Sequence, residues 1–158
     1  MESLANKLGQ RLKAQGARLV TAESCTGGWV AQVVTSVAGS SEWFERGFVT
    51  YSDDSKQELL GVRAATLASH GAVSEETARE MAQGALARSK GTLALAVTGI
   101  AGPGGGSRDK PVGTVCFAWA GKEGVAAETQ RFSGDRDSVR RQSVLRALEG
   151  VLEHLAGG

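Results

Sequence analysis

The sequence predicts an α/β fold of three layers, α/β/α, in which helices cover both faces of a mixed sheet of about five strands. Early in the chain, short apolar runs of strand length alternate with apolar residues at helical spacing. Later, two strand-like runs flank the turn Gly121–Gly124, which is typical of an antiparallel hairpin. A strongly amphipathic pattern, with Val144, Leu148 and Leu155 on one face, then predicts a last helix.

Each expected element has its own signal. Leucines at helical spacing, valines at helical spacing and an alanine-rich face behind a serine cap predict the main helices. The expected helices are residues 2–15, residues 29–37, a short helix that closes at residues 59–62, a helix after the cap Ser74, and a helix that includes residues 144–155. Apolar and β-branched runs predict strands. The expected strands are residues 17–22, 47–51, 93–97, 112–119 and 126–132.

Length and composition favour one domain over residues 1–158, because 41% of the residues are hydrophobic and can form a core. Eighteen basic and seventeen acidic residues leave a formal charge of +1, so we expect no nucleic-acid partner. We expect no signal peptide, and the sequence contains no apolar stretch of membrane-spanning length. The two cysteines have neither metal-ligand spacing nor a disulfide framework, so we expect a cytoplasmic protein without a metal.

Three polar or glycine-rich turns each follow a predicted strand. These turns are residues 23–28, 52–56 and 98–107. The carboxyl ends of parallel strands meet at one edge of a sheet, and open α/β sheets bind their ligands there. The three turns therefore predict an active site at that edge.

The turn at residues 23–28 reads Glu-Ser-Cys-Thr-Gly-Gly and lies where a strand ends and a helix begins. Backbone N–H groups at such a place favour an anion or a developing oxyanion. Ser24 is a candidate nucleophile and Lys56 its candidate base, since none of the turns contains a histidine. Tyr51 could relay a proton or hold a substrate group. Two alternatives stay open: Ser24 is only a helix cap, or Cys25 is the nucleophile.

Two further segments could bind an anion. The loop at residues 98–107 has neither a Walker-type lysine nor a dinucleotide fingerprint, but its glycines let backbone amides approach a ligand closely. Arg136 and Arg140 lie one helical turn apart and could clamp a phosphate. A flexible loop and a solvated helix face are the simpler interpretations of these two segments.

Taken together, these segments resemble the C-terminal domain of the competence-damage-inducible (CinA) family. The resemblance covers nearly the whole chain, in order and with few gaps. The segments that carry it are residues 21–28, residues 47–52 with Lys56, and residues 60–62, 71–75, 81–82, 97–103, 110–115 and 134–136.

The resemblance implies a metal-independent amidohydrolase of NAD salvage that needs no cofactor. Its small-molecule substrate is nicotinamide mononucleotide, whose carboxamide becomes a carboxylate with release of ammonia. Ser24 matches the nucleophile of the family, and Tyr51, Lys56 and Thr98 match its other catalytic positions. Asp53 departs from the family pattern, which commonly has Asn there, and its carboxylate would favour the charged form of Lys56.

We therefore predict acyl transfer to water, with backbone N–H groups around residues 26–28 stabilising the oxyanion. The expected substrate-binding residues are Thr26, Gly27, Gly28, Gly99, Gly102, Gly104, Gly105, Arg136 and Arg140. The alternative function is a non-catalytic nucleotide-binding or regulatory module. The alanine face of the helix after Ser74 and the late edge hairpin predict a homodimer.

Overall fold

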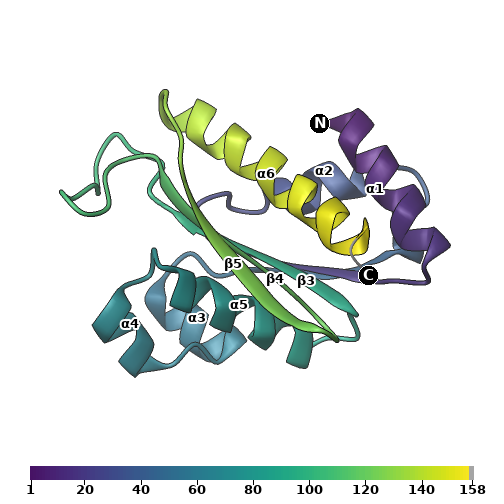
Figure 1. Ribbon diagram of the computed structural model, residues 1–158, viewed down its shortest axis with the longest axis horizontal. Coiled ribbons are helices and arrows are strands. Elements are labelled where there is room, and N and C mark those ends of the chain that lie inside the picture. Colours follow the sequence, from purple (N-terminus) through teal and green to yellow (C-terminus); the bar gives the residue numbers. More distant parts are fainter. Residues whose placement is uncertain (157–158) are drawn as a thin grey trace.

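A five-stranded sheet separates two layers of helices in the computed structural model, which describes residues 1–156 (Figure 1). The strands are β1 (Leu19–Glu23), β2 (Phe44–Val49), β3 (Leu93–Gly99), β4 (Thr114–Gly121) and β5 (Gly124–Arg131). One face of the sheet is covered by α1 (Glu2–Ala14), α2 (Trp29–Thr35) and α6 (Arg136–Ala156). The other face is covered by α3 (Asp53–Leu60), α4 (Ala64–His70) and α5 (Glu75–Ala87). This arrangement confirms the predicted three-layer α/β/α fold.

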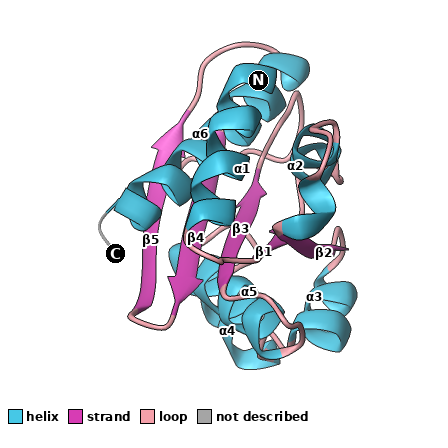
Figure 2. Ribbon diagram, turned by 90° about the vertical axis from the view of Figure 1, so that its right-hand side faces the viewer, coloured by secondary structure: helices cyan, strands magenta, loops and turns pink. Residues whose placement is uncertain are grey.

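The sheet is mixed, and its strands lie in the order β2-β1-β3-β4-β5 (Figure 2). β1 is parallel to β2 and β3, whereas β4 is antiparallel to β3 and β5. At the end of β1, Glu23 lies opposite Val49 of β2 and Val97 of β3. The carboxyl ends of these three strands therefore meet at one edge, as the turns in the sequence predict.

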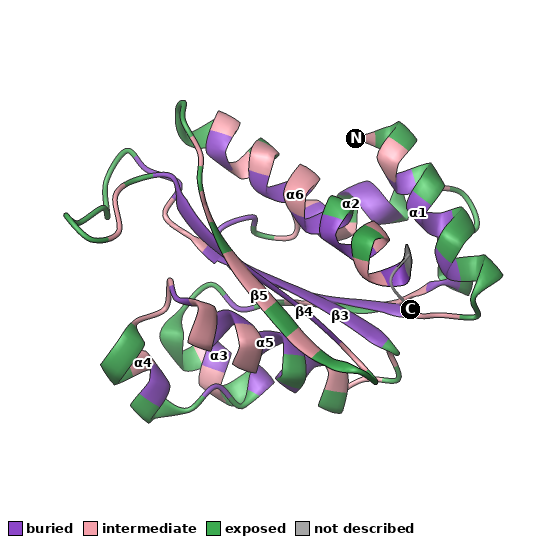
Figure 3. Cartoon of the chain, viewed as in Figure 1, coloured by how far each residue is buried: buried purple, intermediate pink, exposed green. Residues whose placement is uncertain are grey.

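The two faces of the sheet differ in the size of their side chains. Leu95 and Phe117 point into a core shared with α1, α2 and α6, whereas Ala96 and Ala118 point toward α5. Successive side chains of a strand point to opposite faces, so alternation of large and small residues produces two unequal cores. α5 presents mostly alanine to the sheet and packs closely on it, and both helix layers bury their inner faces (Figure 3).

Close packing continues between α5 and the end of α3. A Cβ atom added to Gly84 of α5 would lie 1.8 Å from the carbonyl oxygen of Leu60, the last residue of α3. Only glycine fits at this contact. The contact matters for the site because α3 also carries Lys56.

Every expected helix and strand is present, with ends that differ by a few residues, but α4 was not expected. This short helix is fixed by Glu80 of α5, whose carboxylate accepts hydrogen bonds from the Arg63 N–H at 2.9 Å and the Thr66 hydroxyl at 2.6 Å. Because these contacts come from a different helix, no local pattern indicated α4.

The predicted bounds of the second strand were wrong. β2 begins at Phe44, opposite Leu19, and ends at Val49, so Tyr51 lies beyond the strand with 63% of its surface exposed. The N–H of Thr50 still donates to the Glu23 carbonyl, as a parallel ladder requires, and the chain then leaves the sheet where Ser52 caps α3.

Candidate active site

A cavity of about 270 Å³ lies at the carboxyl ends of β1 and β3, and residues from all three predicted turns line it. Its volume is near the lower end of small-molecule pockets, which span roughly 300–1,000 Å³. The lining residues are Ser24, Cys25, Tyr51, Asp53, Lys56, Ala72, Val73, Thr98, Gly99, Ile100, Ala101, Gly102, Gly104, Gly105 and Arg136. The structure thus brings together the four predicted catalytic residues, four of the predicted glycines and one predicted arginine.

Ser24 and Lys56 form a buried pair in this cavity. The Nζ of Lys56 lies 2.9 Å from the Oγ of Ser24 and also donates to the Thr50 carbonyl oxygen at 2.8 Å. Only 7% of Ser24 and 1% of Lys56 is exposed to solvent. Both acceptors are uncharged oxygen atoms, so neither of these contacts neutralises a lysine charge.

Separate backbone contacts hold the two members of the pair. Ser24 directly follows β1, and its N–H donates to the Val97 carbonyl of β3 at 2.9 Å. Lys56 lies in α3, which begins at a capping box in which the Ser52 hydroxyl accepts the N–H of Ser55. The box fixes where the helix begins, and the side chain of Lys56 extends from the helix toward Ser24 at the end of β1.

Burial lowers the pKa of Lys56 because desolvation disfavours its charged form. The carboxylate of Asp53 opposes this effect and raises the same pKa. A lysine with a lowered pKa has a larger neutral fraction, and the neutral amine can accept a proton from Ser24.

The thiol of Cys25 is in a different electrostatic state. Burial raises its pKa to about 12, and the nearby charge of Glu23 acts in the same direction. A thiol with this pKa is protonated at neutral pH and is a poor nucleophile. The structure therefore favours Ser24 over Cys25.

Ser24 does not cap α2. Gly28 occupies the N-cap position with a φ of 106°, a left-handed conformation that favours glycine. The N–H groups of Val30 and Ala31, in the first turn of the helix, have no partner within the helix. They donate to the carboxylate of Glu23 at 2.8 and 3.1 Å. The anion at this helix N-terminus is therefore a side chain of the protein itself.

Three predicted binding residues, Thr26, Gly27 and Gly28, do not line the cavity. The hydroxyl of Thr26 donates to the Glu23 carboxylate at 2.6 Å, and the N–H of Gly27 donates to the Ser24 carbonyl at 3.0 Å. The Thr26 hydroxyl and the Gly27 N–H thus have acceptors within the turn itself.

The predicted arginines separate in the structure. Arg136 lines the cavity and donates to the Gly102 carbonyl at 2.7 Å. Arg140 does not line it, because its guanidinium donates to the carbonyls of Cys25 and Thr26 at 3.1 and 3.2 Å. Arg140 thus holds the turn at residues 23–28 from outside the cavity.

Tyr51 and Thr98 line the cavity without contacting the Ser24 hydroxyl. The hydroxyl of Tyr51 accepts a hydrogen bond from Arg136 at 3.2 Å. The hydroxyl of Thr98 donates to the Ala72 carbonyl at 2.9 Å and holds the segment before α5 against β3. Both hydroxyls therefore form hydrogen bonds with other residues of the cavity lining.

Sequence reasoning missed several residues at the site. Ala72 and Val73 reach the cavity from the segment between α4 and α5; residues 71–75 carry part of the family resemblance, but nothing in them predicted a place at the site. Ile100 and Ala101 also line it, beside the predicted glycines. Glu23 is fully buried at the end of β1, and no local sequence pattern predicts that an acid is buried there.

Within residues 1–156, no helix is long and apolar enough to cross a membrane. In the same range, no group of three or more His, Cys, Asp or Glu side chains is arranged to hold a metal ion.

Comparison with known proteins places the chain in a family. The model of the CinA C-terminal domain matches residues 1–155. A protein of Escherichia coli (strain K12), nicotinamide-nucleotide amidohydrolase PncC, is 58% identical over 92% of this chain and 89% of its own length. A protein of the same name from Pseudomonas putida is 50% identical over 96% of this chain and 94% of its own. The crystal structure of competence/damage inducible protein CihA from Agrobacterium tumefaciens has a TM-score of 0.94 at 47% identity, covering 98% of this chain and 94% of its own. This chain belongs to the CinA C-terminal domain family.

Proposed function

We propose that this protein is a nicotinamide-nucleotide amidohydrolase with Ser24 as its nucleophile. In this reaction nicotinamide mononucleotide and water yield nicotinic acid mononucleotide and ammonia. The observation that carries the proposal is the 2.9 Å contact between the buried Lys56 Nζ and the Ser24 Oγ. The substrate class follows from the relatives of that name at 58% and 50% identity.

The chemistry takes place in two acyl-transfer steps. Neutral Lys56 accepts the Ser24 proton while the Oγ attacks the carboxamide carbon. The C–N bond then breaks, and ammonia leaves with the proton that Lys56 returns. Water next attacks the acyl-enzyme ester while neutral Lys56 accepts its proton; Lys56 returns that proton to the Ser24 Oγ as the C–O bond breaks, and the acid product ionises to the carboxylate.

A backbone N–H is available for the developing oxyanion. Cys25 lines the cavity directly after Ser24, and its N–H has no acceptor within the described residues 1–156. The residue after the nucleophile donates to the oxyanion in serine hydrolases with a strand–turn–helix nucleophile. Loss of one such donor typically reduces kcat by about 100- to 1,000-fold.

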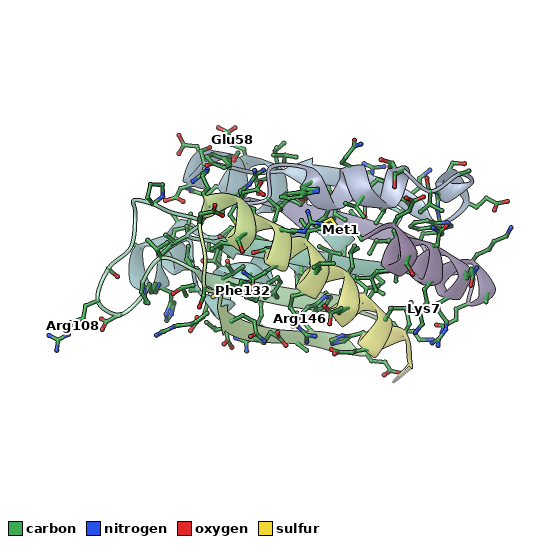
Figure 4. All side chains as sticks on the ribbon, turned by 90° about the horizontal axis from the view of Figure 1, so that it is seen from above. Met1, Lys7, Glu58, Arg108, Phe132 and Arg146 are labelled. Atoms are coloured by element: carbon green, nitrogen blue, oxygen red, sulfur yellow. The ribbon has the colours of Figure 1, made fainter. Side chains whose placement is uncertain are left out.

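The phosphate of the substrate fits the side of the cavity formed by Arg136 and the glycine-rich loop. The guanidinium of Arg136 contacts two uncharged oxygens, those of Gly102 and Tyr51, so its charge can serve a phosphate. Gly104 and Gly105 line the same side without side chains that would obstruct a ligand. Arg108, at the tip of the loop, points away from the body of the protein (Figure 4).

The test is ammonia release from nicotinamide mononucleotide, with EDTA present, by wild type, Ser24→Ala and Lys56→Ala. Exposed Ser41 and Lys122 provide matched controls as Ser41→Ala and Lys122→Ala. We expect wild type and both controls to release ammonia, and both site variants to lose at least about 1,000-fold in kcat while staying folded. Folded wild type that binds the nucleotide but releases no ammonia would instead indicate a binding or regulatory module.

We also propose that the protein works as a homodimer in the cytoplasm. β5 is an edge strand of the sheet, so its outer edge can pair with a second copy; the alanine face of α5 packs on the sheet inside the protomer and does not support the dimer. Light scattering coupled to gel filtration measures the mass directly, and a monomer at micromolar concentration would contradict the dimer.

A further inference from the structure

We propose that Glu23 is a positioning residue for the reaction, whose buried carboxylate holds Ser24 in front of Lys56. This inference rests on the proposed function, in which Ser24 is the nucleophile. Glu23 is fully buried, and it does not line the cavity. It therefore acts through its neighbours and not on the substrate.

The carboxylate of Glu23 fastens the turn that follows Ser24. Its Oε1 accepts hydrogen bonds from the Thr26 hydroxyl at 2.6 Å and the Val30 N–H at 2.8 Å, and its Oε2 accepts the Ala31 N–H at 3.1 Å. A single side chain thus joins the end of β1 to the first turn of α2 across the nucleophile turn. These three contacts leave that turn little freedom to change its backbone conformation.

The backbone of Glu23 is connected to the other member of the pair. Its carbonyl accepts the N–H of Thr50 at 2.8 Å, and the carbonyl of Thr50 accepts a hydrogen bond from Lys56 Nζ at 2.8 Å. Ser24 is covalently bonded to Glu23. The positions of both reacting side chains therefore depend on Glu23, although 32 positions separate Ser24 from Lys56 in the sequence.

The way in which this carboxylate is buried also indicates a positional role. All three of its donors are uncharged groups: one hydroxyl and two backbone N–H groups. Burying a carboxylate is costly, and a well-packed apolar side chain of similar volume often stabilises a fold as much as a buried charged one. A carboxylate is useful here because it accepts three hydrogen bonds at fixed angles, which an apolar side chain cannot do.

The main variant is Glu23→Gln, which keeps the shape of the side chain but replaces one acceptor oxygen by an NH₂ donor. We expect kcat for ammonia release from nicotinamide mononucleotide to fall by about 100-fold, the cost of displacing a reacting group by roughly 1 Å. We expect KM to change by less than about threefold, since the cavity lining is intact.

Glu80→Gln is the matched control for a loss of stability alone. Glu80 also accepts a threonine hydroxyl at 2.6 Å and a backbone N–H at 2.9 Å, with an added Arg63 contact at 3.3 Å, and it lies outside the cavity lining. We expect this variant to lower the melting temperature to a similar extent as Glu23→Gln while kcat stays within about twofold of wild type.

Thr26 provides a milder test that does not depend on folding of the glutamate variant. Thr26→Val removes the hydroxyl that donates to Glu23, and Thr26→Ser keeps it. We expect Thr26→Val to lose about tenfold in kcat and Thr26→Ser to recover most of that loss. A purely structural role predicts instead that kcat remains constant at temperatures where each variant is folded.

The outcomes separate this inference from the proposed function. If Ser24→Ala is inactive but Glu23→Gln and Thr26→Val keep kcat within about threefold of wild type, only the role of Glu23 is wrong. If Ser24→Ala remains active, the proposed nucleophile is wrong, and the role of Glu23 is overturned with it. An equal loss of kcat in Glu80→Gln would also overturn the role, because the effect would then follow stability.

Discussion

Lys56 reaches Ser24 from a different element of the fold, and the two side chains meet at 2.9 Å with almost no exposure to solvent. This contact combines proximity with desolvation. Proximity lets the amine accept the serine proton directly, while desolvation lowers the lysine pKa and increases the neutral fraction that can act as a base. The pair therefore supplies both requirements of a serine–lysine hydrolase.

The first prediction concerns the pH dependence of the reaction. In the proposed mechanism neutral Lys56 is the base, so kcat/KM should rise with pH around a midpoint below the ordinary lysine pKa of about 10.4. Asp53 raises the pKa of Lys56, so Asp53→Asn should move the midpoint to lower pH. Asp54→Asn is the control, because Asp54 is exposed and does not line the cavity. A midpoint that rises in Asp53→Asn would contradict the assignment of Lys56 as base.

The same pKa has a consequence for stability. The unfolded chain keeps Lys56 charged up to about pH 10.4, whereas the folded protein releases that proton at a lower pH. The unfolded state then binds more protons between these two pKa values, so the contribution of Lys56 to stability should rise with pH across that window. Urea unfolding of wild type and Lys56→Met across this range measures the difference, which should be independent of pH if the lysine pKa is unshifted.

The second prediction concerns the thiol beside the nucleophile. Because burial raises the pKa of Cys25 to about 12, iodoacetamide at pH 8 should leave ammonia release by wild type unchanged over an hour. Intact mass should show no adduct on the folded protein, and alkylation of both Cys25 and Cys116 in denaturant provides the positive control. Inactivation together with an adduct on Cys25 would favour the thiol as nucleophile.

The third prediction separates two roles of Tyr51. Its hydroxyl accepts a hydrogen bond from Arg136, so Tyr51→Phe should raise KM about tenfold and change kcat by less than about threefold. Arg136→Ala should raise KM further, and in the double variant the two effects should be less than additive, because they act on one contact. A fall in kcat at constant KM in Tyr51→Phe would instead support a proton relay.

The fourth prediction concerns stability away from the site. Arg146 of α6 holds Glu128 of β5 through two contacts, at 2.7 and 2.8 Å, and its hydrogen bonds lower the pKa of Glu128. Glu128→Gln should cost about 1 kcal/mol and lower the melting temperature by roughly 3 °C at pH 7.

A lowered carboxyl pKa stabilises the fold above the unfolded value, and that contribution is lost as the pH falls through the folded pKa. The difference between Glu128→Gln and wild type in thermal unfolding should therefore shrink at pH 3. Glu123→Gln, in the exposed hairpin turn, is the control. An equal difference at pH 7 and pH 3 would contradict the ionic origin of the effect.

Much of the fold could be predicted from the sequence because its signals are local. Apolar periodicity distinguishes strands from helices, and the turn chemistry after each strand follows from the residues themselves. The convergence of three turns at one edge follows from parallel strands, and the structure confirms that β1, β2 and β3 are parallel. The choice of Ser24 and Lys56 needed only the absence of histidine from those turns and the resemblance to a known family.

The tertiary structure alone decided which of the candidate groups face the cavity. Arg136 and Arg140 are equivalent in the sequence pattern, but only Arg136 lines the cavity, because Arg140 donates to carbonyls behind the nucleophile turn. The contacts of Glu23 could not be predicted either, since nothing local says that a buried carboxylate will meet the first turn of α2. Periodicity determines which elements form, whereas the direction of each side chain depends on contacts between elements distant in the sequence.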